Sequence, residues 1–366
     1  MYSVNDIVSI AKRENNTKRS YLIVNKLQSK HVPVSPEKTL TMLSQLYDKF
    51  KNNFDPEKTL LVGFAETATA IGSYLALRLG CRYIQTTRED IEGAEYIAFT
   101  ESHSHATAQR IVKNGIEKVI DNISDIIFAE DELTTGNTIL KAAAAVNAAF
   151  PGKKLRYSAV SVLNCMGEPE LLRYKTEGID LYYLLKVQNS SFPEIADSYR
   201  KTGVYHLPEL TQGDCVQQYT ISGRINPRLI TDASAYRQAI DSLAKQAALL
   251  IKASDRSVLV IGTEEFMYPA IKCAEFIEKK GISALCHSTT RSPIEVYLDE
   301  GYPLRERYEL LSLYDDSRKT FIYDLKKHDR VIIITDSDNK GRGEKTLISA
   351  LKSAGNDNII LVRWTK

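Results

Sequence analysis

Residues 126–140 of the sequence read IIFAEDELTTGNTIL. The apolar run predicts a buried strand that ends in two adjacent acids, Glu130 and Asp131. The Thr/Gly turn at 134–138 then predicts the start of a helix over the Ala-rich residues 139–150. A strand that leads directly into a helix is typical of a parallel sheet covered by helices on both faces.

The turn has the composition of a phosphate site. A helix N-terminus leaves backbone N–H groups unpaired and carries a partial positive charge, which favours an anion. Threonine hydroxyls add donors, and Gly136 lets the backbone approach closely. The two acids upstream would meet a sugar beyond the phosphate, where carboxylates accept hydrogen bonds from hydroxyls or hold a hydrated Mg²⁺. The segment therefore predicts a site for a phosphorylated sugar; the alternative is an acidic loop that caps a helix.

Similar strand–helix alternation continues along the chain of 366 residues. Strands are predicted at 60–64 and 155–163, among others, and the pattern loosens over the polar segment 206–227. A chain of this length usually forms two domains. We therefore predict an α/β fold with two Rossmann-like parallel-sheet domains, residues 1–215 and residues 225–366.

The second half of the chain resembles the first. An apolar strand ends in glycine at 61–63 and at 260–262, and a Thr-Thr-Arg run follows at 86–88 and at 289–291. A later strand, VIIITDSDNKGRGEKTL at 331–347, again leads through an acidic loop with glycines into a helix. The second domain is either a degenerate copy of the first or has converged on one nucleotide-type fold. The other explanation is that α/β domains in general share strands that end in glycine before a helix.

Composition excludes several classes of protein. Basic and acidic residues number 48 and 46, which argues against an extended nucleic-acid surface. The five cysteines show no CxxC spacing, so we expect buried free thiols. The sequence has neither a signal pattern nor an apolar run long enough to span a bilayer. We predict a soluble, cytoplasmic protein without a membrane partner.

Residues 130–138, EDELTTGNT, resemble the motif with which type I phosphoribosyltransferases bind phosphoribosyl pyrophosphate (PRPP). The resemblance implies a type I phosphoribosyltransferase fold for the first domain and contacts from Glu130 and Asp131 to the ribose hydroxyls. It also implies that Mg²⁺ is the cofactor and is bound through PRPP, with these two acids nearby. The 5-phosphate would lie on Thr134, Thr135, Gly136, Asn137 and Thr138.

The family also implies a pyrophosphate loop after the first strand of the sheet. Here that position carries Ala65, Glu66, Thr67 and Ala68, whose small residues permit close approach and whose glutamate could reach a metal-bound water. A bare strand-to-helix turn would look similar.

Type I enzymes carry a hood over PRPP between these two loops. In that region Arg88 is a candidate pyrophosphate partner, because guanidinium binds phosphate oxygens in bidentate fashion. His103 and His105 would share a face of an extended strand, where they could bind pyrophosphate or protonate the departing group or the base. Two solvated loop histidines are the alternative, and a zinc site would need further ligands.

A further set of segments extends over nearly the whole chain. They are Lys30-His31-x-Pro33, GFAETATAIG (63–72), QTTRE (85–89), ESHSHA (101–106), AEDELTTGNT (129–138) and HSTTRSP (287–293). Together they resemble phosphoribosyltransferases fused to a C-terminal TRSP domain, which is named for the run found here at 290–293. Such proteins occur in bacteria with tellurium-resistance-type stress gene clusters, and a role in making a nucleoside-like metabolite has been inferred.

The second domain lacks the Thr-Thr-Gly-x-Thr loop and allows three interpretations. It binds a phosphorylated ligand, completes the first site, or is structural. The candidate ligand residues are Thr290, Arg291, Ser292, Asp336, Lys340 and Arg342.

The resemblance predicts an Mg²⁺-dependent transfer of ribose 5-phosphate from PRPP to a nitrogenous base, with release of pyrophosphate. The alternatives are a non-catalytic PRPP or nucleotide sensor and a regulatory assembly protein on the same fold. The acceptor base is unidentified, and residues 13–36, with Arg19, Lys30 and His31, are the first place to look for its specificity. Homodimers are common in the family.

Overall fold

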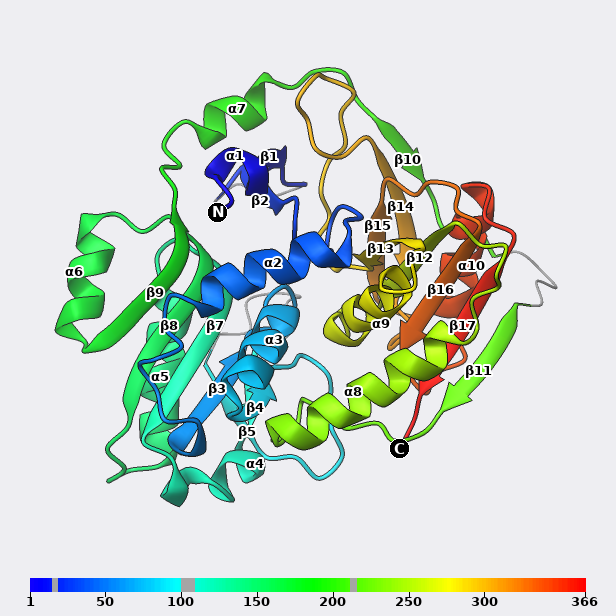
Figure 1. The fold of residues 1–366 in the computed structure, drawn as a ribbon. Helices are drawn as coiled ribbons and strands as arrows, with labels where there is room; N and C mark the ends of the chain where they lie inside the picture. Colours follow the sequence, from blue (N-terminus) through cyan, green and yellow to red (C-terminus); the bar gives the residue numbers. More distant parts are fainter. Residues whose placement is uncertain (15–18, 100–108, 211–215) are drawn as a thin grey trace. The chain divides into compact units, whose positions relative to one another are not determined.

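The computed structural model describes residues 1–14, 19–99, 109–210 and 216–366 (Figure 1). The chain forms two compact units, each built from separate segments. The first unit consists of Leu43–Gln188 and Ile225–Gln238. The second consists of Met1–Met42, Asn189–Arg224 and Ala239–Lys366.

The first unit contains a sheet of five parallel strands in the order β4-β3-β7-β8-β9. Apolar side chains bury the central strands on both faces, as in other parallel sheets. The strands are β3 (Thr59–Gly63), β4 (Arg82–Gln85), β7 (Asp125–Leu133), β8 (Arg156–Asn164) and β9 (Ile179–Lys186).

Helices and short turns connect these strands. The helix α3 packs on β3, β4 and β7. Two glycines allow its close approach, because a Cβ on Gly72 would lie 2.7 Å from the Cα of Gly63. The connecting elements are η1 (Pro56–Lys58), α3 (Thr69–Leu79), α4 (Lys113–Glu117), η2 (Ile120–Asn122), α5 (Asn137–Ala149) and α6 (Glu168–Thr176).

The strand order reverses its direction between β3 and β7. From β3 the chain passes through α3 to β4 on one side, and it then returns across β3 to β7 on the other. This return carries an antiparallel ribbon made of β5 (Tyr96–Ala98) and β6 (Arg110–Val112). Open α/β sheets bind ligands outside the carboxyl ends of the strands at such a switch point.

The second unit repeats this topology. Its five parallel strands lie in the order β13-β12-β16-β17-β11, so β13, β12, β16 and β17 correspond to β4, β3, β7 and β8. The prediction of two parallel-sheet domains is confirmed. The strands are β11 (Gln217–Ile221), β12 (Ser257–Gly262), β13 (Ser283–Ser288), β16 (Arg330–Thr335) and β17 (Ile359–Trp364).

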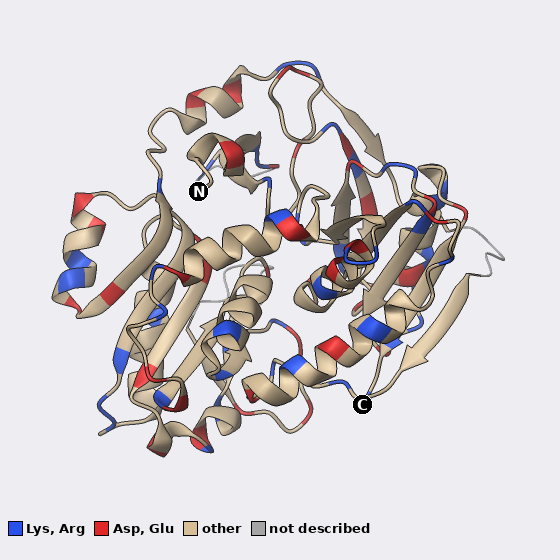
Figure 2. Ribbon diagram, viewed as in Figure 1, with Lys and Arg blue, Asp and Glu red and all other residues tan. Residues whose placement is uncertain are grey.

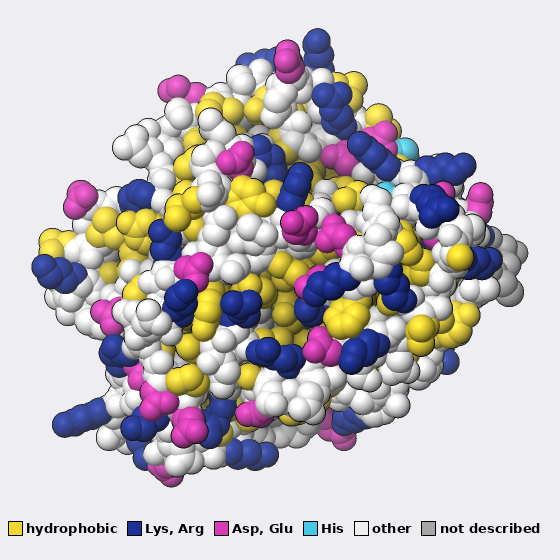
Figure 3. Space-filling model, viewed as in Figure 1, with side chains coloured by type: hydrophobic (Ala, Val, Ile, Leu, Met, Phe, Trp, Pro, Cys, Tyr) yellow, Lys and Arg dark blue, Asp and Glu magenta, His cyan; other side chains and the backbone are white. Residues whose placement is uncertain are grey.

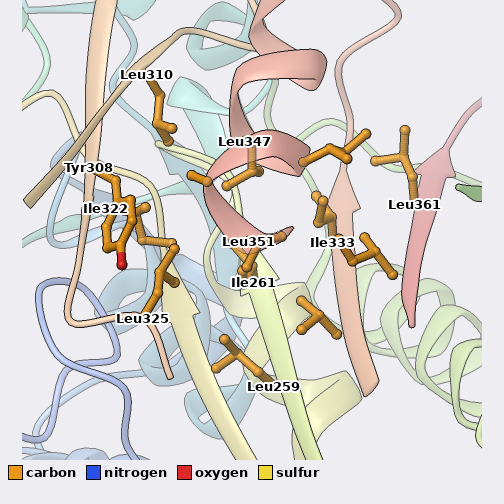
Figure 4. Packing of buried hydrophobic residues seen from close by; sticks show 14 of the residues in the cluster. Leu259, Ile261, Tyr308, Leu310, Ile322, Leu325, Ile333, Leu347, Leu351 and Leu361 are labelled. Atoms are coloured by element: carbon orange, nitrogen blue, oxygen red, sulfur yellow. The ribbon is translucent and has the colours of Figure 1, made fainter. Parts of the chain in front are cut away.

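A second, smaller sheet and several helices complete the second unit. Figure 4 shows its core, a single cluster that contains Leu347 and Leu351 of α10, Leu310 of β14 and Ile333 of β16. The remaining elements are β10 (Val204–His206), β14 (Glu306–Leu311), β15 (Lys319–Tyr323), α7 (Phe192–Ser198), α9 (Tyr268–Glu278) and α10 (Arg342–Ser353). Two helices, α2 (Pro36–Tyr47) and α8 (Ala233–Ala248), are divided between the units.

The N-terminal residues belong to the second unit because of their packing. After α1 (Val4–Ile7), the strands β1 (Val8–Lys12) and β2 (Tyr21–Asn25) form an antiparallel hairpin. Its apolar side chains Ala11 and Val24 share a core cluster with Ile294 and Phe321. The units are therefore interleaved along the chain, and the limits 1–215 and 225–366 stay a prediction about sequence domains.

The segment 206–227 is not only a linker. Its middle forms β11, the exposed edge strand that pairs with β17. Residues 225–238 then join the first unit, where Thr231 exchanges backbone hydrogen bonds of 2.9 and 2.8 Å with Tyr83. This pairing covers the edge of β4, which would otherwise expose unpaired backbone groups.

Charged side chains of both signs are distributed over the surface, and the described cysteines are buried. Figure 2 shows lysine and arginine alternating with acids in both units, and the face in Figure 3 carries interspersed charges of both signs. Cys81, Cys165, Cys273 and Cys286 are buried free thiols, and Cys215 lies outside the described residues. Within those residues, no helix is long and apolar enough to cross a membrane.

Candidate active site

The acid pair lies on the last part of β7 rather than after it. β3 ends at Gly63, which is paired with Ala129, whereas β7 continues through Glu130 and Asp131 to Leu133. The acids therefore extend beyond the neighbouring strand, at the edge where the sheet reverses its order. All three acids of this run, 130–132, are partly buried.

The predicted pyrophosphate loop begins directly beside these acids. The amide of Phe64 donates to the carbonyl of Ala129 over 3.0 Å, so the loop leaves β3 at the level of the acid pair. Ala65 and Ala68 are buried, whereas Glu66 and Thr67 are partly exposed. The peptide bond between Ala65 and Glu66 is cis.

Two residues without an assigned role in the sequence hold this loop. The Thr86 hydroxyl, fully buried at the end of β4, accepts a hydrogen bond of 2.8 Å from the amide of Ala65. The side-chain amide of Gln109 donates to the carbonyl of Ala65 over 2.7 Å. Thr86 lies within the QTTRE run, and that run was the one signal from which its role could have been found.

The predicted phosphate loop connects β7 to α5. Gly136 precedes the helix with φ +66°, a left-handed conformation that glycine adopts without strain. Thr135 and Asn137 are exposed, and Thr134 and Thr138 are partly buried. A polar loop at a helix N-terminus, with hydroxyls and backbone amides at its surface, is suited to a phosphate.

Helix α6 supports the phosphate loop through two neighbouring residues. The hydroxyl of Tyr174, a buried residue, donates to the carbonyl of Gly136 over 2.9 Å. The exposed Arg173 guanidinium donates to the carbonyl of Thr135 over 2.8 Å and to Oδ1 of Asn137 over 2.7 Å. Arg173 thus adds positive charge beside the N-terminus of α5. No local pattern indicated these residues, which follow the loop by more than thirty positions.

Electrostatics distinguish the first acid of the pair. Burial raises the pKa of Glu130 well above its ordinary value, and the neighbouring Asp131 carboxylate raises it further. Two adjacent carboxylates in this setting favour a ligand that donates hydrogen bonds to them, such as ribose hydroxyls, or one that offsets their charge, such as a hydrated Mg²⁺. The donor set therefore fits a metal that enters with PRPP. Across the described ranges, no group of three or more His, Cys, Asp or Glu could hold a metal by itself.

Of the remaining residues predicted for the first site, the structure describes Arg88 but not the two histidines. Arg88 is partly buried, two positions after Thr86, on the chain that leads from β4 into the β5–β6 ribbon. His103 and His105 lie outside the described residues, so their roles stay predictions.

The candidate residues of the second unit are engaged within the protein. Arg291 Nε lies 2.6 Å from Glu264 Oε2, and the amide of Thr290 donates to the carbonyl of Phe321 in β15. Asp336 Oδ1 accepts 2.6 Å from the Tyr314 hydroxyl.

The other three candidates differ in exposure. The carbonyl of Ser292 accepts from the Tyr323 hydroxyl over 2.7 Å. Arg342 and Lys340 are exposed, but the backbone amide of Arg342 donates to Asp316 Oδ2 over 3.0 Å.

Lys30 also has an internal role. It is fully buried, and its ammonium donates to the carbonyls of Glu264 and Thr289 over 2.9 and 3.0 Å, all within the second unit. The expectation that Lys30 bears on base specificity is therefore not supported by its contacts.

Comparison with known families identifies the class. The family model described as phosphoribosyl transferase matches residues 7–183, so the protein is a phosphoribosyltransferase. The model described as a TRSP domain C-terminal to that transferase matches residues 228–351. The chain belongs to the family in which the two domains are fused.

The comparison with solved structures matched this chain to adenine and orotate phosphoribosyltransferases. The adenine enzyme from Thermoanaerobacter pseudethanolicus is 16% identical, with a TM-score of 0.37 over 50% of this chain and 98% of that one. The Giardia lamblia enzyme complexed with 9-deazaadenine is 14% identical, with a TM-score of 0.37 over 51% and 99%. The orotate enzyme from Aeropyrum pernix is 16% identical, with a TM-score of 0.33 over 52% and 93%. The comparison with curated proteins found no match.

Proposed function

We propose that the enzyme transfers ribose 5-phosphate from PRPP to a nitrogenous base, at the carboxyl ends of β3 and β7. In this reaction the bond from the anomeric carbon to pyrophosphate breaks, a carbon–nitrogen bond to the base forms, and the base gives up a proton. One observation carries the proposal. The pyrophosphate loop leaves β3 beside the acid pair of β7, and β7 leads directly into the phosphate loop.

Each loop has a separate task in this proposal. The phosphate loop, Thr134 to Thr138, binds the 5-phosphate through hydroxyls, backbone amides and the N-terminus of α5. Glu130 and Asp131 accept hydrogen bonds from the ribose hydroxyls and stabilise the positive charge that develops on the anomeric carbon. The loop from Ala65 to Ala68 binds pyrophosphate, with Arg88 as its cationic partner.

Mg²⁺ would be held by PRPP with Glu130 and Asp131 nearby, and it supplies neutralisation of the pyrophosphate charge. We further propose that the base gives rise to a nucleoside-like metabolite and that the enzyme acts in the cytoplasm as a homodimer. A setting in stress gene clusters of the tellurium-resistance type belongs to the same proposal.

The test is release of pyrophosphate from PRPP, measured against a panel of purines, pyrimidines and related bases. Asp131→Asn should lower kcat about 10² to 10³-fold, because one interaction made in the transition state is lost. The matched control is Asp121→Asn, which changes an exposed acid of the same unit whose partner is Lys153. We expect the control to keep its rate. A rate for Asp131→Asn close to that of Asp121→Asn would remove Asp131 from the mechanism.

A further inference from the structure

The second unit repeats the hydrogen bonds of the first at the equivalent edge of its sheet. In the first unit the carbonyl of Gly63 accepts from the Thr86 amide over 2.9 Å. In the second unit Gly262 accepts from the Thr289 amide over 3.1 Å, and the Thr289 hydroxyl accepts from the amide of Glu264 over 3.1 Å. The second unit thus has the same backbone geometry at the place that corresponds to the predicted ligand site of the first, outside β12, β13 and β16.

A hairpin is inserted at the same point of both topologies. In the first unit the β5–β6 ribbon lies between β4 and β7, and in the second the antiparallel pair β14–β15 lies between β13 and β16. The residues that join β14 to β15, 312–318, contact all three parts of the second unit that correspond to the ligand loops of the first.

The first contact is to the loop after β12, which corresponds to the pyrophosphate loop. The Ser312 hydroxyl donates to Oε1 of Glu264, and Arg318 Nη2 lies 3.0 Å from Oε2 of the same carboxylate. Glu264 is only 1% exposed, so Arg318, together with Arg291, offsets a charge that is removed from solvent, and Ser312 adds a hydrogen bond.

The second contact is to the residues after β16, which correspond to the acid pair. The Tyr314 hydroxyl donates to Asp336 Oδ1 over 2.6 Å, and the Ser337 hydroxyl donates to the carbonyl of Leu313 over 2.6 Å. Asp336 and Ser337 are both buried.

The third contact is to the N-terminus of α10, which corresponds to the phosphate loop. Asp316 Oδ2 accepts from the amide of Arg342 over 3.0 Å, and Oδ1 accepts from the amide of Gly343 over 3.1 Å. A Cβ on Gly341 would lie 2.3 Å from Asp316 Oδ2, so the carboxylate fills the space in front of the helix. The hydrogen bond from Arg342 lowers the pKa of Asp316, which keeps this carboxylate charged. Its two oxygens take the amides that a bound phosphate would use.

We infer that residues 312–318 are the resident occupant of the ligand position in the second unit, with the Asp316 carboxylate in place of a phosphate. The second unit therefore takes a segment of its own chain and offers no site to a phosphorylated ligand while Asp316 is in place. This agrees with a loop that lacks the Thr-Thr-Gly-x-Thr pattern but contains Gly341 and Gly343, which have no room for a side chain beside Asp316 and Ser312. The inference concerns the second unit alone and holds whichever base the first unit uses.

The experiment is a titration of the full-length, deuterated and ¹⁵N-labelled chain with inorganic phosphate, in which the amide resonances of Arg342 and Gly343 are followed. In the wild type these resonances should not move. In Asp316→Ala they should shift and saturate at millimolar phosphate, because two helix N-terminal amides are released. The control is Asp315→Ala, which removes a neighbouring exposed carboxylate that accepts hydrogen bonds from Ser317. In this control, added phosphate should not shift the two resonances.

A second variant protects the test against misfolding of Asp316→Ala. Asp316→Asn keeps the size of the side chain but leaves one acceptor oxygen and no charge, so one of the two amides is released and the resonances should respond to phosphate as in Asp316→Ala, though more weakly. Movement of the Arg342 and Gly343 resonances in the wild type would overturn the inference. It would equally be overturned if a folded Asp316→Ala or Asp316→Asn protein gave no response.

Discussion

Substitution of Gly136 by alanine tests whether the phosphate loop needs its present shape. Gly136 has φ +66°, and a Cβ at this position would lie 2.4 Å from Cε2 of Tyr174. Tyr174 is 1% exposed and its hydroxyl is bound to the carbonyl of Gly136, so the ring has little room to move away. The added methyl group must therefore displace the loop or strain the packing of α6.

Two costs contribute to the expected effect. The left-handed conformation costs alanine about 1–2 kcal/mol, and overpacking against a buried ring costs about 1–3 kcal/mol. The free energy of unfolding should therefore fall by about 2–5 kcal/mol. If the loop moves to relieve this strain, the same energy appears as weaker PRPP binding. A loss of about 2 kcal/mol corresponds to roughly a thirtyfold rise in Kd.

The assay is chemical unfolding together with calorimetric titration of PRPP and Mg²⁺. Gly152→Ala is the matched control, because Gly152 has φ +87° and nothing lies within 4 Å of the position of its Cβ. It should show the conformational cost alone, about 1–2 kcal/mol, with unchanged PRPP affinity. If Gly136→Ala unfolded like Gly152→Ala and bound PRPP like the wild type, the shape of the phosphate loop would not matter for binding.

Three further predictions concern the same site. The kcat/KM for PRPP should rise as the pH passes through the raised pKa of Glu130, and Glu130→Gln should abolish this rise. Glu130→Gln should also raise the Tm at neutral pH, because a carboxyl whose pKa is raised in the folded state destabilises the fold once it is charged. Tyr174→Phe removes one hydrogen bond to the phosphate loop, worth about 0.5–1.5 kcal/mol, so KM for PRPP should rise a few-fold while kcat is kept; a fall in kcat alone would contradict this role. Thr86→Val leaves the buried amide of Ala65 without its acceptor, at a cost of about 1–3 kcal/mol, and should weaken pyrophosphate inhibition; equal inhibition of variant and wild type would exclude Thr86 as a support of that loop.

Local patterns carried the prediction of the first site. The apolar run, the acid pair and the Thr/Gly turn are consecutive, and each has a chemical meaning that does not depend on distant residues. β7 nevertheless continues through the acids to Leu133, and α3 begins only at Thr69. These ends depend on pairing with β8 and on the loop geometry after β3, which composition does not specify.

Long-range packing was not predictable from the sequence. The N-terminal hairpin belongs to the second unit because Ala11 and Val24 pack with residues near 294 and 321, and nothing local indicates such partners. The polar strand β11 lies in the segment 206–227, where no strand was predicted because an exposed edge strand lacks apolar alternation. Asp316 resembled any loop acid until the structure placed its carboxylate at the N-terminus of α10.

The most direct test of the central claim is isothermal titration calorimetry of PRPP with Mg²⁺ into the wild-type protein and into an Asp131→Asn/Thr135→Ala variant. We predict micromolar binding to the wild type, with one PRPP for each chain, and loss of this binding in the variant. Absence of binding to a folded wild-type protein would contradict the assignment of the site at the carboxyl ends of β3 and β7. Equal binding to wild type and variant would contradict it as well, because PRPP would then be held elsewhere.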